Sequence, residues 1–137
     1  VQDPPPLPYL DSAWNRAQGA LAIRMNAWIL TPRMRAEGAA PVTLTDAQFA
    51  LMYWTAAQMV AHHATNGCNL LPGDLLGSGT VSGPEDGARA CLAEIGLTGA
   101  ISLPNGESRR WLLDGDEVIF RARASTRCRS TGASSPA

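Results

Sequence analysis

Residues 45–85 read TDAQFALMYWTAAQMVAHHATNGCNLLPGDLLGSGTVSGPE, and the first half of this stretch has the pattern of an amphipathic helix. Thr45 followed by Gln48 matches a capping box, in which side chains satisfy the free N–H groups at a helix start. One face then carries residues at three- and four-residue intervals: Phe49, Met52, Tyr53, Ala56, Val60 and His63. Gly67 suits a left-handed C-terminal cap. The pattern predicts one long helix over about 46–66.

The remaining segments have the character of strands. Residues 21–30 alternate apolar with polar or small side chains, the period of a strand with one buried face. Beyond Gly67, short apolar pieces separated by glycine, proline and aspartate predict strands at 69–80, 100–103, 110–113 and 117–122. Asp114-Gly115 between the last two predicts a hairpin, because both residues tolerate positive φ. The expected fold is mainly β with one long helix.

Two segments differ from the rest of the chain. Residues 3–8 hold four prolines, which fix φ and predict an extended connector. Residues 121–137 contain four arginines, no acid and no large apolar side chain, so a disordered Arg/Ser-rich tail is expected. The expected organisation is one incomplete domain over 1–120 followed by a divergent tail over 121–137.

The composition of the chain limits the kinds of partner and the location that we expect. The formal net charge of -1, from 11 basic and 12 acidic residues, indicates no nucleic-acid partner and no anionic membrane surface. No apolar run approaches the roughly 20 residues that span a bilayer, and residues 1–10 lack the pattern of a secretory signal. Three widely spaced cysteines fit a reducing compartment, so a cytoplasmic location is expected.

Some side chains invite a chemical interpretation. His62 and His63 point about 100° apart on a helix, which disfavours a shared metal ion and favours one packed and one solvated ring. Cys68 lies near them and permits a Cys/His nucleophile pair, but nothing in the sequence orients it. Residues 77–80, GSGT, suit either close approach to a ligand or a tightly packed strand. Glu94 lies between Leu92 and Ile95 and is either partly buried or on the surface.

The segment MYWTAAQMVAHHATNGCNLLPGDLLGSGTVSGPE, residues 52–85, resembles the signature of fumarylacetoacetases. Residues 2–10, QDPPPLPYL, and 103–119, LPNGESRRWLLDGDEVI, are similar to the flanking parts of that family. The resemblance covers residues 2 to about 120 and implies a partial mixed β-sandwich roll from the C-terminal part of the catalytic domain. Isomerases and acylpyruvate hydrolases of the same superfamily have a shorter TGTP-like motif in place of SGTVSGPE.

The resemblance implies a hydrolase acting on C–C bonds in ketonic substances. The implied reaction cleaves 4-fumarylacetoacetate to fumarate and acetoacetate in tyrosine and phenylalanine catabolism, with Mg²⁺ and Ca²⁺ in the full-length family, whose members form homodimers. A histidine activates water and a cation stabilises the charge that develops on the diketo acid, chemistry that C–C hydrolysis requires.

Only supporting residues carry over. Thr80 matches a substrate-binding threonine, and Glu94, 14 residues later, matches the glutamate that orients the catalytic histidine. That histidine and the metal carboxylates belong upstream of residue 2, so no metal ligand is expected in this chain, and His62-His63 match a structural pair. The tail departs from the family's IGFGxCxG-like strand, which motivates the hypothesis of a frameshifted end.

The isolated chain is therefore expected to be inactive. The alternatives are an inactive truncated relic, a docking fragment, or a related diketo-acid hydrolase of the same superfamily.

Overall fold

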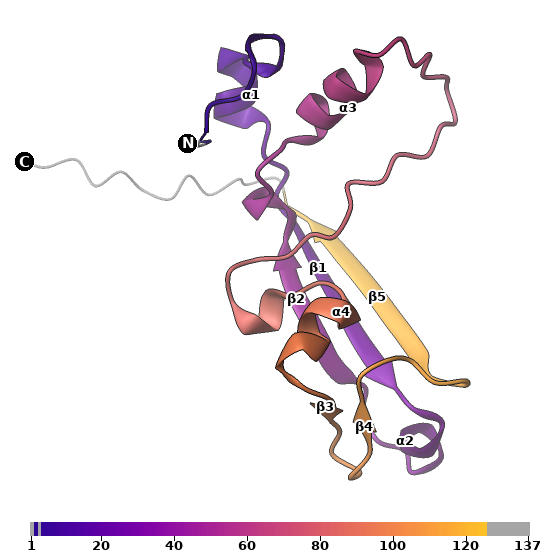
Figure 1. Cartoon of the computed structure of the whole chain (residues 1–137). Coiled ribbons are helices and arrows are strands. Elements are labelled where there is room, and N and C mark those ends of the chain that lie inside the picture. Colours follow the sequence, from indigo (N-terminus) through magenta and orange to yellow (C-terminus); the bar gives the residue numbers. More distant parts are fainter. Residues whose placement is uncertain (1, 3, 126–137) are drawn as a thin grey trace, which may run out of the picture.

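The computed structural model describes residue 2 and residues 4–125. Three antiparallel strands form its centre, with short helices and a small hairpin arranged around them (Figure 1). In chain order the elements are η1 (Pro8–Leu10), α1 (Ala13–Gln18), β1 (Ile23–Leu30), α2 (Pro32–Ala36), β2 (Val42–Gln48), η2 (Phe49–Leu51), α3 (Ala56–Ala64), η3 (Asp86–Ala88), α4 (Leu92–Ile95), η4 (Gly96–Thr98), β3 (Ile101–Ser102), β4 (Ser108–Arg109) and β5 (Glu117–Ala124). The η elements are 3₁₀ helices.

The main sheet has the order β2-β1-β5, and both strand pairs are antiparallel. The central strand β1 confirms the strand predicted at residues 21–30. Ala27 lies opposite Thr45 on one side and Phe120 on the other, so these side chains share a face. A β-bulge between Ala27 and Trp28 shifts the register with β2. The fold is mainly sheet, as expected from the sequence.

The predicted long helix over 46–66 is wrong. Its first part belongs to β2 and to η2, and the longest helix, α3, has only nine residues. The capping box exists, but Thr55 and Gln58 form it, not Thr45 and Gln48. Thr45 lies inside β2 because this stretch pairs with β1, and sheet pairing overrides a weak local helix preference. Gly67 takes the expected positive φ, 83°, just after α3.

The predicted hairpin is also misplaced. The observed hairpin joins β3 to β4 through Asn105-Gly106, where Gly106 has φ 81° and the Leu103 N–H donates to the Glu107 carbonyl at 2.8 Å. Gly115 forms a turn with φ 86°, yet the strands on its two sides have different partners, since β5 pairs with β1. A turn dipeptide therefore located the bend correctly but not the strand pair.

Other strand predictions need correction as well. Residues 69–80 form no strand and have an irregular backbone, with Gly73 at φ 100° and Gly79 at φ 76°, angles that interrupt a ladder. The strand predicted at 110–113 is absent, and β4 lies just before it. β5 continues to Ala124, which corrects the expected start of the tail at 121. The remaining part of the predicted disordered tail, residues 126–137, lies outside the described residues.

The proline-rich start was expected to act only as a connector, but it packs against α3. The Gln58 side chain donates to the Leu10 carbonyl at 3.1 Å, and Tyr53 donates to the Pro4 carbonyl. Thr55 Oγ and the Asn15 side chain lie 2.9 Å apart. These contacts tie the N-terminal segment to the start of α3.

The hydrophobic core is small. Ile29, Met34 and Leu103 are its buried centre, whereas Leu75, Leu97 and Phe120 are 98%, 83% and 77% exposed. Neither one long helix nor a closed sandwich is present in the part of the chain that the structure describes. Within the same part, no helix is long and apolar enough to cross a membrane.

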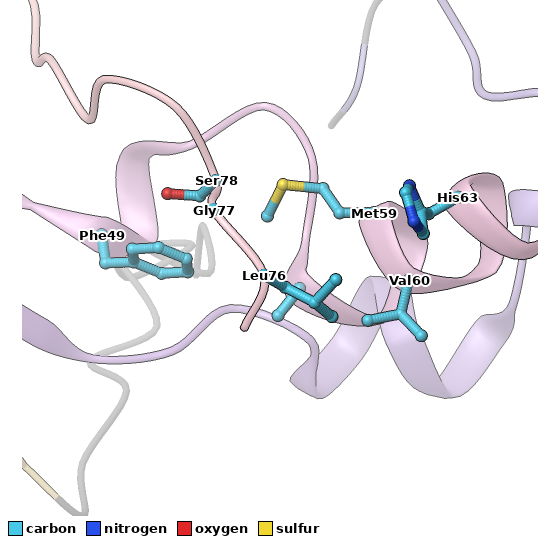
Figure 2. A pocket seen from close by; sticks show the side chains of 8 residues that line it. Phe49, Met59, Val60, His63, Leu76, Gly77 and Ser78 are labelled. Atoms are coloured by element: carbon cyan, nitrogen blue, oxygen red, sulfur yellow. The ribbon is translucent and has the colours of Figure 1, made fainter. Parts of the chain in front are cut away.

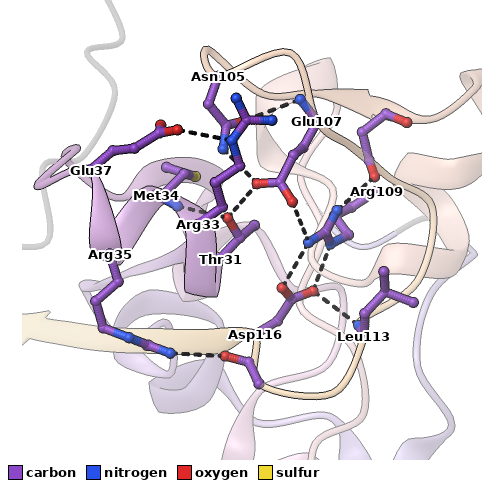
Figure 3. Close-up of polar contacts among 12 residues, drawn as sticks. Thr31, Arg33, Met34, Arg35, Glu37, Asn105, Glu107, Arg109, Leu113 and Asp116 are labelled. Carbon is purple, nitrogen blue, oxygen red and sulfur yellow. Dashed lines mark hydrogen bonds and ion pairs between the residues drawn. The ribbon is translucent and has the colours of Figure 1, made fainter.

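A buried polar network joins the hairpin to the main sheet (Figure 3). Arg109 donates to Asp116 through Nε at 2.8 Å and through a terminal nitrogen at 3.1 Å, and it also reaches Glu107 at 3.2 Å. Thr31, the N-cap of α2, donates to Glu107 at 2.6 Å. The Asp116 side chain is fully buried and that of Arg109 is 7% exposed. The network therefore fixes the bend before β5 against α2.

This network predicts acid sensitivity. The Arg109 guanidinium holds the pKa of Asp116 below its ordinary value of 3.8, and Thr31 is the first cause that lowers the pKa of Glu107 below 4.5. Because both folded-state pKa values are depressed, the stabilisation is present above the ordinary values and is lost as pH falls through the folded values. We expect urea unfolding to show a falling free energy as the pH drops below 4.5. A free energy of unfolding that is flat from pH 5 down to about pH 2 would contradict this.

Candidate functional site

Glu94 is held by hydrogen bonds in a loop-and-helix arrangement next to the sheet. It lies in α4, and its Oε2 accepts from Ser82 Oγ at 2.6 Å and from the Ala90 N–H at 3.2 Å. The Ala90 N–H also lies 3.1 Å from Ser82 Oγ. Leu92 and Ile95, on either side of Glu94, line an apolar groove with Ala27 and Phe120 of the sheet. The apolar neighbours thus face a groove that they share with the sheet, while Glu94 bonds to the loop.

The surroundings of Glu94 favour its charged form. The Ser82 hydroxyl is the largest cause that lowers the pKa of this carboxyl below 4.5, and the Ala90 N–H adds to it. Partial burial raises the pKa but does not outweigh the donors. The side chain is half-buried, between the two sequence interpretations. The Cys91 backbone and thiol also lower this pKa, so Glu94 is an oriented anion bonded to the loop before it.

Ser82 is the residue that sequence reasoning missed. It lies two positions after Thr80 and 12 before Glu94. The sequence shows that both side chains are present, a hydroxyl at 82 and a carboxylate at 94. It does not show their pairing, because the pairing depends on the fold of residues 83–93. Thr80 itself is exposed. Thr80 lies on the same segment as Ser82, whose hydroxyl binds Glu94. Among the described residues there is no direct hydrogen bond between Thr80 and Glu94.

The residues just before Thr80 line an apolar cavity. It has a volume of about 320 Å³ and lies between α3, which supplies Met59, Val60 and His63, and residues 76–78, with Phe49 of η2 at one end (Figure 2). Gly79 takes φ 76°, a conformation that favours glycine, immediately after the cavity wall. The GSGT stretch therefore lies beside a hollow and does not form a tightly packed strand.

The two histidines make separate contacts. His62 Nδ1 lies 2.7 Å from the Tyr9 hydroxyl, and the two rings are stacked. His63 Nε2 lies 3.4 Å from Cys68 Sγ, so the structure does bring together the Cys/His pair that the sequence disfavoured. Both rings are exposed, which corrects the expectation of one packed histidine. Within the described chain nothing binds the other nitrogen of His63, so the pair lacks the orienting group of a nucleophilic site.

The described residues do not fit a metal site. Across residue 2 and residues 4–125, no three histidine, cysteine, aspartate or glutamate side chains are grouped closely enough to hold an ion. The carboxylates that do cluster, Glu107 and Asp116, are bound by Arg109. Cys68 and Cys91 are free thiols.

Comparison with known proteins identifies the family. The model of the family described as fumarylacetoacetate (FAA) hydrolase C-terminal matches residues 13–131. The chain is 45% identical over 124 residues to a fumarylacetoacetase of Bos taurus, 44% identical over 124 residues to one of Homo sapiens, and 42% identical over 120 residues to one of Arabidopsis thaliana. Each match covers 87% of this chain and 27% of the relative, so the chain spans about a quarter of their length. The chain belongs to the fumarylacetoacetate (FAA) hydrolase C-terminal family.

Proposed function

We propose that this chain is the C-terminal part of a fumarylacetoacetase, which hydrolyses the C–C bond of 4-fumarylacetoacetate to give fumarate and acetoacetate in tyrosine and phenylalanine catabolism. The observation that carries the proposal is the Glu94 carboxylate, held in its charged form by Ser82 and Ala90. The names of the relatives and the share of them that the chain covers support a partial site rather than a complete one.

The proposed role of Glu94 is positioning. A carboxylate that accepts a hydrogen bond from one imidazole nitrogen fixes the histidine tautomer, so that the other nitrogen faces water as a base. In this proposal the imidazole N–H donates to Oε1, because Ser82 and Ala90 both donate to Oε2. The histidine itself would come from sequence outside this stretch.

Thr80 is proposed to contact the substrate. It is exposed beside the cavity and follows Gly79, whose positive φ turns the backbone at that point. A threonine hydroxyl both donates and accepts hydrogen bonds and therefore suits a keto or carboxylate oxygen of a diketo acid. The Mg²⁺ or Ca²⁺ that the family resemblance implies would be held outside this chain, since the described residues offer no ligand cluster.

The complete domain is proposed to close as a mixed β-sandwich roll over the open apolar groove of the sheet, which Phe120 lines while 77% exposed. A homodimer is proposed from the family resemblance, and a cytoplasmic location is proposed from the three widely spaced cysteines, which fit a reducing compartment.

The first experiment compares two proteins. We expect the purified 137-residue chain, supplied with Mg²⁺ or Ca²⁺, to leave the absorbance of fumarylacetoacetate unchanged. A hybrid in which this chain follows the upstream part of the Bos taurus fumarylacetoacetase, the part that it does not match, should hydrolyse the substrate. Hydrolysis by the isolated chain would overturn the proposal that this chain supplies only part of the active site.

An inactive hybrid that is nevertheless folded would favour the truncated relic over the enzyme part. A folded hybrid that hydrolyses another diketo acid and leaves fumarylacetoacetate intact would instead place the chain with the related hydrolases of the superfamily.

A further inference from the structure

Three arginines gather on one face of the main sheet. Arg24 of β1 lies directly opposite Arg123 of β5, and Asn26 lies opposite Arg121. Because side chains of a strand alternate between faces, and opposed residues share a face, these four side chains point to the same side of the sheet. This is the side away from the Ala27–Phe120 pair and from the groove that α4 lines.

The positive charge on this face is only partly balanced. Arg24 forms a two-pronged contact with Asp46, with Nε to Oδ1 at 2.7 Å. Arg121 lies over the Trp28 ring, 5.6 Å from its centre. In the described part of the chain no carboxylate pairs with Arg121 or Arg123. Glu117, on the same face of β5, is taken by Arg35 at 2.9 Å. One carboxylate therefore faces three guanidinium groups.

The arginines line a hollow. Its volume is about 450 Å³, and its walls are Arg24, Asn26, Trp28, Arg121, Ala122 and Arg123. The stacked position over Trp28 restricts the Arg121 guanidinium while leaving N–H groups at its edge available to donate. Like charges directly across a sheet repel each other, and an anion between Arg24 and Arg123 relieves that repulsion.

We propose that this arginine groove binds a multivalent oxyanion, bearing carboxylate or phosphate groups. Guanidinium groups bind both through paired charge-assisted hydrogen bonds. Neither Thr80 nor Glu94 lines the groove, so the proposal does not depend on the proposed hydrolase function.

Isothermal titration of the full chain with citrate and with inorganic phosphate, at low ionic strength, tests the proposal. We expect saturable binding of at least one of them in about the millimolar range; the arm that saturates at lower concentration shows whether carboxylate or phosphate fits better. R121Q and R123Q should each weaken binding about fivefold, the loss of one exposed charge-assisted contact. The matched control is R110Q, which removes an exposed arginine outside the groove.

Two results would overturn the proposal. One is the absence of saturable heat with both anions in a chain that is folded by circular dichroism. The other is an equal loss of affinity in R110Q and R121Q, which would show a response to net charge alone. Potassium chloride at matched ionic strength serves as the monovalent control, because exposed charges are screened by salt.

Discussion

In the active hybrid, E94Q is expected to lower kcat about a hundredfold or more, with a much smaller change in KM. Glutamine keeps the size of the side chain but removes the charge that Ser82 and Ala90 stabilise in the native residue. A neutral amide binds the imidazole N–H more weakly and can present its own N–H, which selects the wrong tautomer of the histidine. The loss should therefore fall on the step in which water is activated rather than on substrate binding.

The pH dependence separates positioning from a merely structural role. In the wild-type hybrid the carboxylate stabilises the protonated imidazole, so the kcat profile of E94Q should move to lower pH. The matched control is E85Q, the same change at an exposed glutamate nine residues earlier, just before η3, which should keep both kcat and its pH profile. If E94Q retained kcat, or if E85Q lost as much, the positioning role would be ruled out.

D116N is expected to cost the chain about 3 kcal/mol of folding free energy, the effect of breaking a buried ion pair on one side. The Asp116 side chain is fully buried, and its two oxygens accept from Arg109 and from the Leu113 N–H at 2.9 Å. An asparagine there leaves the Arg109 charge without its main counterion inside the network (Figure 3). The denaturation midpoint in urea, with the slope held constant, measures the change.

Two further variants make this prediction specific. E37Q removes the exposed pair between Arg33 and Glu37, 2.8 Å apart, and should leave the midpoint unchanged, because exposed pairs contribute little. The double variant R109M/D116L removes both charges and should recover most of the loss, since a buried pair replaced by apolar side chains is often neutral. A midpoint that falls as far in E37Q as in D116N would refute the argument.

Local pattern predicted some elements correctly. The alternation of residues 21–30 predicted β1 correctly, because a period of two is a property of neighbouring residues alone. The short apolar run at 118–120 likewise predicted β5. Gly67 and Gly115 adopt positive φ where turns were expected. The resemblance of residues 52–85 to fumarylacetoacetases was likewise a matter of sequence, and the family match confirms it.

Choices between partners could not be read locally. Thr45-Gln48 and Thr55-Gln58 both match a capping box, and only the pairing of β2 with β1 decides which of them begins a helix. Asn105-Gly106 and Asp114-Gly115 are both hairpin dipeptides. Only the first joins two paired strands, because β5, which follows the second, pairs with β1. Such choices depend on long-range contacts, whose free energy outweighs the small differences in local preference.

The sequence by itself determined the family, the strands β1 and β5, and the identity of Thr80 and Glu94 as candidate residues. Tertiary structure alone decided that Ser82 holds Glu94, that Arg109 meets Asp116 inside the fold, and that Arg24 faces Arg123 across the sheet. The physical reason is that a hydrogen bond or ion pair needs two groups within about 3 Å, and residues 12, 7 or 99 positions apart reach that range, or the adjacent strand, only through the folded chain.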